Sequence, residues 1–174
     1  MYRHELSSLI QGCGKELNGI EVGVASGNYS VILNAWGFKN LYLVDAWEEF
    51  RDQTGKLTTQ ATCDKWYKDL QKRVPNANIY KAKSLDAVKV FADNYFDFIY
   101  IDADHSYKSV KDDLNAWWPK CKKGGLMAGH DYLLKGTGVK QAVDEFCKSK
   151  NIKISLTKGS FRIPASWYFI KGEI

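Results

Sequence analysis

Carboxylate and imidazole groups follow two apolar runs of the chain, each at the point where the run ends. The first run ends in Asp102, which Asp104 and His105 follow closely, and the second ends in His130 and Asp131. Such groups can hold a divalent cation, and an imidazole can also move a proton near neutral pH. If the runs are neighbouring parallel strands, their ends meet at the edge where ligands bind in such sheets. The sequence therefore predicts a reactive cluster at this edge.

A second set of residues is typical of a nucleoside site. Glu21 lies in a short buried-strand pattern that runs into a turn bracketed by Gly23 and Gly27, and glycine permits the close approach of a ligand. Asp45 ends the next apolar run, about 20 residues beyond the glycines, where a carboxylate can accept hydrogen bonds from a ribose diol. A carboxylate inside an apolar strand needs a partner, so we expect Glu21 to face a cofactor ammonium or a turn amide.

The spacing of the glycines argues against a dinucleotide. Ala25 lies between Gly23 and Gly27, so the middle glycine of a Gly-x-Gly-x-x-Gly fingerprint is missing. That glycine allows the backbone to approach a pyrophosphate closely. A nicotinamide-dependent oxidoreductase is therefore the weaker alternative.

Strand and helix patterns alternate along the chain, which predicts a single α/β domain over residues 1–174 with a doubly wound, Rossmann-like sheet. The last two strands are joined by too few residues for a helical crossover, so we expect a C-terminal antiparallel hairpin on an otherwise parallel seven-stranded sheet. The expected strands are 19–24, 40–45, 77–82, 96–102, 123–130, 152–157 and 166–171. The expected helices are 3–16, 27–36, 59–73, 84–92, 107–121 and 137–149.

Composition limits the class of protein and its partners. The chain has 174 residues, of which 45% are hydrophobic and 26% charged, as in an ordinary globular domain. No apolar run approaches the roughly 20 residues of a membrane helix, and the amino terminus is charged, so we expect a cytoplasmic protein with no membrane partner. The scattered cysteines favour neither zinc nor disulfides. A modest net charge of +5 gives no clear sign of a nucleic-acid partner.

The order of these motifs resembles that of a known family. From about Gly19 to Lys171 the chain carries Glu-x-Gly-x-x-x-Gly, a strand-end Asp, Asp-Phe-Ile-Tyr-Ile-Asp-Ala-Asp-His-Ser-Tyr and Gly-Gly-Leu-Met-Ala-Gly-His-Asp-Tyr. This order is similar to that of the class I S-adenosylmethionine (SAM)-dependent methyltransferases. It resembles most the small branch whose fourth and fifth strands end in Asp-x-Asp-His-Ser-Tyr and His-Asp-Tyr. The resemblance implies that SAM is the cofactor.

The resemblance also implies how the cofactor is held. The glycine turn would lie against the aminoacyl part of SAM, Asp45 would bind the ribose, and Ser84 would lie near adenine. Ser84 is equally a good helix N-cap, and Asp104 can contact the cofactor, orient His105 or cap the following helix. The expected cofactor-binding residues are Glu21, Gly23, Gly27, Asp45, Ser84, Asp102 and Asp104.

The cluster of acids and imidazoles is similar to the site of metal-dependent O-methyltransferases. Asp102 matches their first metal ligand, and His130 with Asp131 matches an acidic and amide pair, so these three are the expected ligands of Mg²⁺ or another divalent cation. Histidine replacing a carboxylate is a departure, and a metal-free site stays open. His105 stands where those enzymes place a general-base lysine, which makes Asp102 and His105 the expected catalytic residues. Alternatively, His105 caps the helix or bonds a carboxylate.

Three functions remain open at this point. The first is SAM-dependent methyl transfer to a hydroxyl of a small-molecule acceptor, since the chain lacks the Asn-Pro-Pro-Tyr and Pro-Cys segments of base-modifying enzymes. The second is a non-catalytic nucleotide-binding module that serves as a partner or regulatory subunit, and the third is the oxidoreductase. A homodimer is expected if a second subunit completes an exposed cofactor site.

Overall fold

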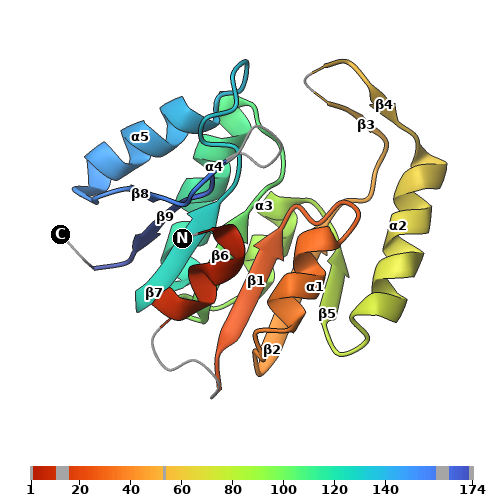
Figure 1. The fold of residues 1–174 in the computed structure, drawn as a ribbon, viewed down its shortest axis with the longest axis horizontal. Helices are drawn as coiled ribbons and strands as arrows, with labels where there is room; N and C mark the ends of the chain where they lie inside the picture. The colour runs from red at the N-terminus through yellow and green to blue at the C-terminus, as the bar shows by residue number, and fades with distance from the viewer. Residues whose placement is uncertain (1, 11–15, 53, 160–164, 173–174) are drawn as a thin grey trace.

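Seven strands form the central sheet of the computed structural model, which describes residues 2–10, 16–52, 54–159 and 165–172. In sheet order they are β5 (Asn78–Lys81), β2 (Asn40–Asp45), β1 (Asn18–Val22), β6 (Phe96–Ile101), β7 (Cys121–Gly129), β9 (Trp167–Ile170) and β8 (Ser155–Leu156), as Figure 1 shows. The first five run parallel, whereas β9 is antiparallel to both β7 and β8. The predicted doubly wound sheet with a C-terminal antiparallel hairpin is confirmed.

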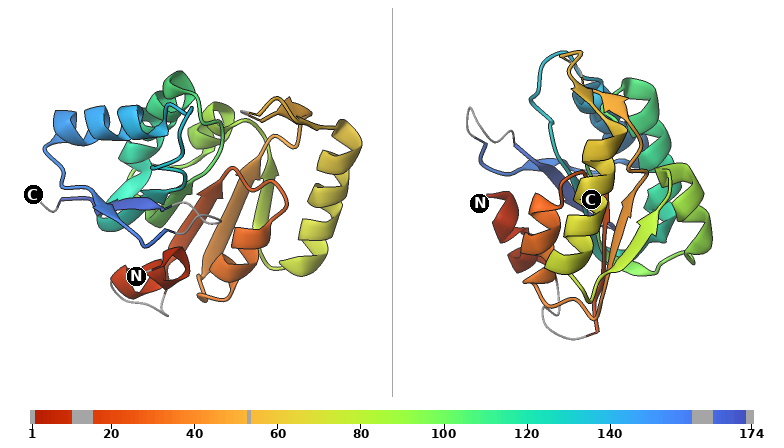
Figure 2. Two further views of the ribbon diagram at one scale, coloured as in Figure 1. Left: turned by 45° about the horizontal axis from the view of Figure 1, so that its top comes forward. Right: turned by 90° about the vertical axis from the view of Figure 1, so that its right-hand side faces the viewer.

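Helices cover both faces of this sheet (Figure 2). The helices on one face are the 3₁₀ helix η1 (Arg3–Leu9), α1 (Asn28–Asn34) and α2 (Gln60–Arg73). The helices on the other face are α3 (Ser84–Ala87), α4 (Tyr107–Trp117) and α5 (Val139–Lys150), with the short 3₁₀ helices η2 (Val88–Val90) and η3 (Trp118–Lys120) after α3 and α4. The sheet is therefore a layer between two helical layers.

The central strand β6 shows why the sheet is apolar on both faces. Phe98 and Tyr100 belong to the core shared with η1, α1 and α2, whereas Ile99 and Ile101 belong to the core shared with α4 and α5. All four are at most 5% exposed. A strand that is buried on both faces reads as a continuous apolar run, and this run was the basis for placing β6.

The strand predicted over 152–157 is reduced to β8, and the helix predicted over 84–92 is α3 followed by η2. Two further segments differ more from the prediction. The helix predicted over residues 3–16 is a 3₁₀ helix that ends at Leu9, and residues 11–15 lie outside the described part of the chain. The loop after β2 contains a short antiparallel pair, β3 (Phe50–Arg51) and β4 (Leu57–Thr58), which has too few residues to show a strand pattern. This pair and the loop after β7 lie where the parallel strands end (Figure 1), so both loops lie at the ligand edge of the sheet.

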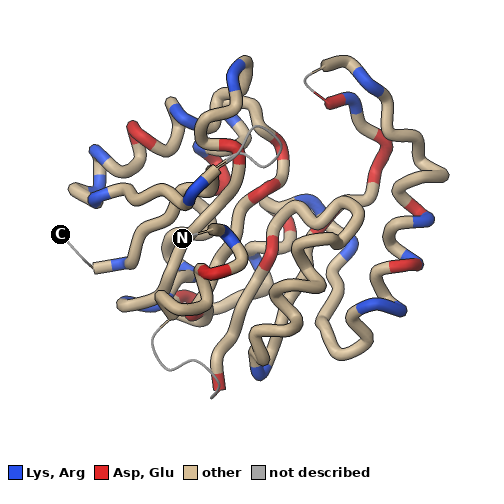
Figure 3. Tube along the Cα trace, in the orientation of Figure 1, with Lys and Arg blue, Asp and Glu red and all other residues tan. Residues whose placement is uncertain are grey.

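Charge is mixed along the surface elements. Lys and Arg alternate with Asp and Glu along the helices instead of forming one continuous stripe (Figure 3). Within the described ranges, no helix is both long enough and apolar enough to cross a membrane.

Candidate active site

The turn after β1 lies directly against the end of β6, which is possible because the residue at the contact is a glycine. Gly23 has a φ of +90°, and a Cβ at this position would lie 2.2 Å from the backbone oxygen of Asp102. The amide of Asp102 also donates to the carbonyl of Val22 at 2.7 Å. Only glycine fits here, because any larger residue would clash with backbone and not with a flexible side chain. The predicted glycine turn and the predicted acid cluster are therefore in direct backbone contact.

Asp45, the last residue of β2, organises this turn. Its Oδ2 accepts hydrogen bonds from the amides of Val24 and Ala25, both at 2.8 Å, and its Oδ1 accepts one from the amide of Trp47 at 2.7 Å. Ala25 and Trp47 both have a positive φ, which is uncommon for residues other than glycine. The indole of Trp47 donates to the carbonyl of Ala25 at 3.0 Å. Strained backbone fixed by a carboxylate is typical of ligand sites.

Glu21 lies inside the core, and the protein group that bonds its side chain is a hydroxyl and not the predicted turn amide. A contact with a cofactor ammonium stays a prediction. The side chain of Glu21 accepts a hydrogen bond from the hydroxyl of Ser30 on α1. Burial raises the pKa of Glu21 to about 8, although the Ser30 hydrogen bond opposes this rise. The negative charge of Asp102 raises that pKa further. The chain therefore holds a protonated or easily protonated carboxyl directly under the glycine turn.

The shifted pKa of Glu21 predicts that unfolding stability falls as pH rises. The ordinary pKa is 4.5 and the folded value about 8, so the stabilisation is fully present below pH 4.5 and is lost as pH rises through 8. At about 1.4 kcal/mol per unit of pKa shift, the loss amounts to several kcal/mol. Glu21→Gln keeps the shape without the titration, so its unfolding free energy should fall much less over this range. A smaller slope should remain from Asp113, whose pKa burial raises to about 6, and from His105, whose pKa is also raised.

Urea unfolding at several pH values from 5 to 9 measures this slope. Glu48→Gln is the matched control, because Glu48 is 60% exposed and pairs with Lys83 at the surface. The control should retain the wild-type slope. An unchanged slope in Glu21→Gln would show that another group titrates.

Two carboxylates and two imidazoles meet at the ends of β6 and β7. Nε2 of His105 lies 3.3 Å from Oδ1 of Asp102 and 3.2 Å from Oδ2 of Asp131. Nδ1 of His130 lies 2.9 Å from Oδ1 of Asp131 and 3.8 Å from Oδ2 of Asp102. The pairing of Ile101 with the last residue of β7 brings these groups together, because Asp102 and His130 follow directly on adjacent strands.

The carboxylates and imidazoles of the cluster shift one another's pKa values, and they are partly shielded from water. The hydrogen bond to Asp102 raises the pKa of His105, although burial opposes this. Burial acts to raise the pKa of Asp131, but the hydrogen bond from His130 and the positive charges of His130, His105 and Arg3 together outweigh it and lower that pKa. Asp131 has a φ of +58° and is 6% exposed. Nε2 of His130 is buried without a hydrogen-bond partner in the structure.

This geometry offers a place for a cation. Within the described part of the chain, Asp102, His105 and Asp131 offer ligand atoms that all lie within 4.8 Å of one another. The sequence singled out Asp102, His130 and Asp131, whereas this group contains His105 in place of His130. His130 lies beside the group, and its role as a ligand stays a prediction. A cavity of about 10 Å³ lies between Asp102, His105 and His130. This volume is about that of a single water or ion.

Two predicted cofactor residues lie outside this cluster. Asp104 is exposed, and its Oδ1 accepts the amide of Ser106 at 2.7 Å where α4 begins, so it helps to start that helix. Ser84 is the first residue of α3, whose N-cap is Lys83 and not Ser84. The Ser84 hydroxyl donates to Asp113 and accepts from the indole of Trp117 at 2.8 Å. These contacts join α3 to α4, and cofactor binding by either residue stays a prediction.

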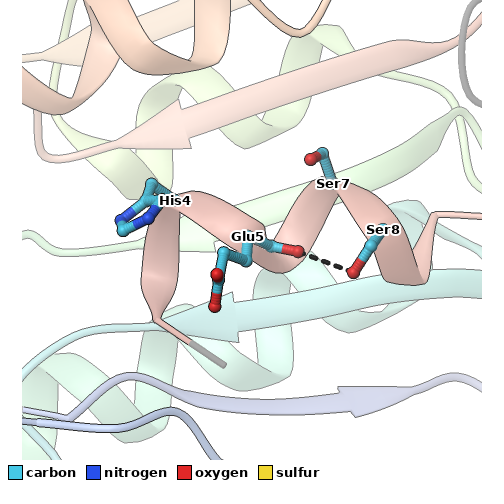
Figure 4. A pocket seen from close by; sticks show the side chains of 4 residues that line it. All are labelled: His4, Glu5, Ser7 and Ser8. Carbon is cyan, nitrogen blue, oxygen red and sulfur yellow. Dashed lines mark hydrogen bonds between the residues drawn. The ribbon is translucent and has the colours of Figure 1, made fainter.

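A larger hollow lies apart from the cluster, along η1. It has a volume of about 510 Å³ and is lined by His4, Glu5, Ser7 and Ser8 (Figure 4). His4 stacks on Tyr2, with ring centroids 5.7 Å apart. The hollow is an open surface, and the acids and imidazoles that can do chemistry lie elsewhere. Sequence reasoning missed a different residue of η1, Arg3, whose guanidinium lies 4.6 Å from the ring centroid of Tyr29.

A family described as a methyltransferase domain matches residues 20–132 of the chain. The chain belongs to this family. The matched region contains the glycine turn, Asp45 and the whole cluster around Asp102, so the resemblance to class I SAM-dependent methyltransferases is confirmed. No curated protein sequence matches the chain.

Solved structures of methyltransferases share the fold. The O-methyltransferase NovP is 15% identical and has a TM-score of 0.71, covering 98% of this chain and 78% of its own. An O-methyltransferase from Bacillus cereus in complex with S-adenosylhomocysteine (SAH) is 13% identical with a TM-score of 0.68, covering 97% and 80%. An rRNA methylase from Streptococcus thermophilus is 13% identical with a TM-score of 0.63, covering 97% and 93%. At such identities the likeness concerns the fold.

Proposed function

We propose that this protein transfers a methyl group from SAM to a hydroxyl group of a small-molecule acceptor. One observation carries the proposal. The aligned ends of β1, β6 and β7 place Gly23, Asp102 and His130 side by side, so a cofactor on the glycine turn lies next to groups that can activate an acceptor. Methyl transfer from a sulfonium is an in-line displacement, for which this juxtaposition supplies alignment.

The negative charge of the site suits SAM as the methyl donor. The carboxylates of Asp45 and Asp102 flank the glycine turn, and their charges raise the pKa of the buried Glu21, which favours its neutral form. SAM carries a positive sulfonium and a positive ammonium, which such an acidic site attracts. A pyrophosphate would meet the same carboxylates and be repelled. The charge of the site thus supports SAM over a dinucleotide.

The residues present also fit a divalent cation. Asp102 and Asp131 would hold it, together with an imidazole of His105 or His130. The buried Nε2 of His130, which has no partner in the structure, is consistent with a site that lacks one of its components. A bound cation would lower the pKa of the acceptor hydroxyl. Carboxylates with one imidazole suit Mg²⁺ or Mn²⁺.

His105 is the proposed proton acceptor. Its Nε2 faces both Asp102 and Asp131, so the neutral ring keeps its proton on Nε2, where it forms a hydrogen bond with a carboxylate. Nδ1 is then the basic nitrogen. The same two carboxylates stabilise the imidazolium that forms when Nδ1 takes up the acceptor's proton. Asp102 thereby orients the base while it also faces the cofactor turn.

Methyl transfer to a panel of aromatic alcohols and sugars tests this function, with SAH release as the readout. The enzyme is first freed of metal by a chelator and then supplied with Mg²⁺ or Mn²⁺. We expect transfer to at least one class of hydroxyl, lost on chelation and restored by the cation. Undiminished transfer after chelation would contradict the role of the cation. SAH binding with no transfer to any hydroxyl would favour the non-catalytic binding module, and transfer to RNA would favour a different acceptor.

A further inference from the structure

The 3₁₀ helix η1 is fixed against the same face of the sheet as α1. Leu6 is fully buried and Ile10 is 6% exposed, and both pack in one core with Tyr29 and Tyr100. The hydroxyl of Tyr29 donates to the carbonyl of Arg3 at 3.1 Å. Both views of Figure 2 place η1 beside α1. The position of Arg3 is therefore set by the core and not by a loose terminus.

The side chain of Arg3 reaches the region between the glycine turn and β6. Its guanidinium lies 4.6 Å from the ring centroid of Tyr29, the second residue of α1, which follows the glycine turn directly. It also donates a hydrogen bond to the hydroxyl of Tyr100, two residues before Asp102 on β6. Tyr100 and Tyr29 pack with their ring centroids 4.4 Å apart. The two tyrosines hold the guanidinium between the cofactor turn and the acid cluster.

Arg3 is a cation placed among carboxylates with which it does not pair directly. Its positive charge acts on Glu21 and Asp131, and the charge of Asp102 acts on Arg3. Among the ion pairs of the described residues, none joins a carboxylate to Arg3 within 4.0 Å. A guanidinium has several N–H donors in a planar fork, and the hydroxyl of Tyr100 takes only part of this capacity. Some N–H groups of Arg3 are therefore left to bind an anionic group of a ligand.

We propose that Arg3 binds the carboxylate of the methionine part of SAM, an inference that rests on the proposed function. This part of SAM is a zwitterion. Its ammonium and the sulfonium suit the carboxylate of Asp102, but that carboxylate repels the carboxylate of SAM. Arg3 lies over the first turn of α1 and offers the opposite charge. A guanidinium and a carboxylate form paired, charge-assisted hydrogen bonds, so this contact both holds and orients the tail.

Calorimetric titration with two ligands tests this contact. The ligands are SAH and S-adenosyl-3-thiopropylamine, which is SAH without its carboxylate. Wild type should bind SAH about 10- to 100-fold more tightly, the range expected for hydrogen bonds between charged groups. Arg3→Met should remove this preference by weakening SAH alone, and Arg3→Lys should restore part of it. Lys72→Met on α2 removes the same charge from a side chain that is 79% exposed and should leave the preference unchanged.

The ratio of the two affinities separates recognition from folding. If Arg3→Met weakens both ligands by the same factor, Arg3 supports the site but does not bind the carboxylate, and the proposal is overturned. Equal binding of SAH by wild type and Arg3→Met overturns it too; a raised KM for acidic acceptors would then assign Arg3 to the acceptor. If wild type binds neither ligand, the proposed function itself fails.

Discussion

Replacing Asp45 with alanine is expected to weaken SAH binding at least a hundredfold. Asp45 accepts hydrogen bonds from the amides of Val24, Ala25 and Trp47, and two of these residues have positive φ angles. Each hydrogen bond to a charged group contributes about 1.5–3 kcal/mol. Without the carboxylate, the turn loses the three side-chain hydrogen bonds that hold its strained backbone, and the predicted contact with the ribose is lost as well.

Calorimetry with SAH measures this effect, and thermal unfolding shows how much of the variant is folded. Asp64→Ala is a matched control, because Asp64 is an exposed carboxylate that pairs with Lys81 at 3.5 Å on the surface. It should bind SAH as wild type does. Wild-type affinity in Asp45→Ala would mean that the turn keeps its shape alone and that Asp45 makes no important contact with the cofactor.

Asp102→Asn is expected to lower the rate of methyl transfer about a thousandfold or more while SAH affinity stays within about threefold. The amide keeps the size of the side chain but removes the charge that faces His105 at 3.3 Å and His130 at 3.8 Å. A cation ligand and the partner that orients the base are lost together. SAH lacks the positive sulfonium and keeps only the ammonium, so its binding should depend on this charge far less than methyl transfer does.

This combination of a lower rate and a nearly unchanged affinity is tested by initial rates at saturating SAM and by a separate measurement of SAH affinity. Asp93→Asn is the control, because Asp93 precedes β6 at its opposite end and pairs with Lys120 at 2.7 Å. The control should transfer methyl groups at close to the wild-type rate. Full activity in Asp102→Asn would contradict both the cation site and the role of His105.

The sheet was predictable because its parallel strands are buried on both faces. Residues 41–44, 98–101 and 126–129 are continuous apolar segments at the carboxyl ends of these strands, and glycines or carboxylates mark their ends. Neighbouring parallel strands then bring the residues after them together without further information. For this reason the approach of Asp102, His130 and Asp131 to one another followed from the pattern of the sequence, whereas the contact between Gly23 and Asp102 came from the structure.

Other features depend on contacts between distant segments, which periodicity does not encode. Nothing in the sequence around Glu21 indicates that Ser30 is its partner, because a turn of unknown shape separates them. The position of Arg3 depends on how η1 packs over Tyr29. His105 joins the possible cation ligands only because the chain after β6 folds back toward Asp131. The short β3 and β4 pair shows no strand pattern at all.

Calorimetric titration of the purified protein with SAH, using NAD as the control ligand, tests the central claim most directly. We predict saturable binding of SAH at one site and no binding of NAD, because the turn lacks a middle glycine and the site is rich in carboxylates. If the folded protein does not bind SAH, or binds NAD in its place, the claim that this glycine turn is a SAM site is contradicted.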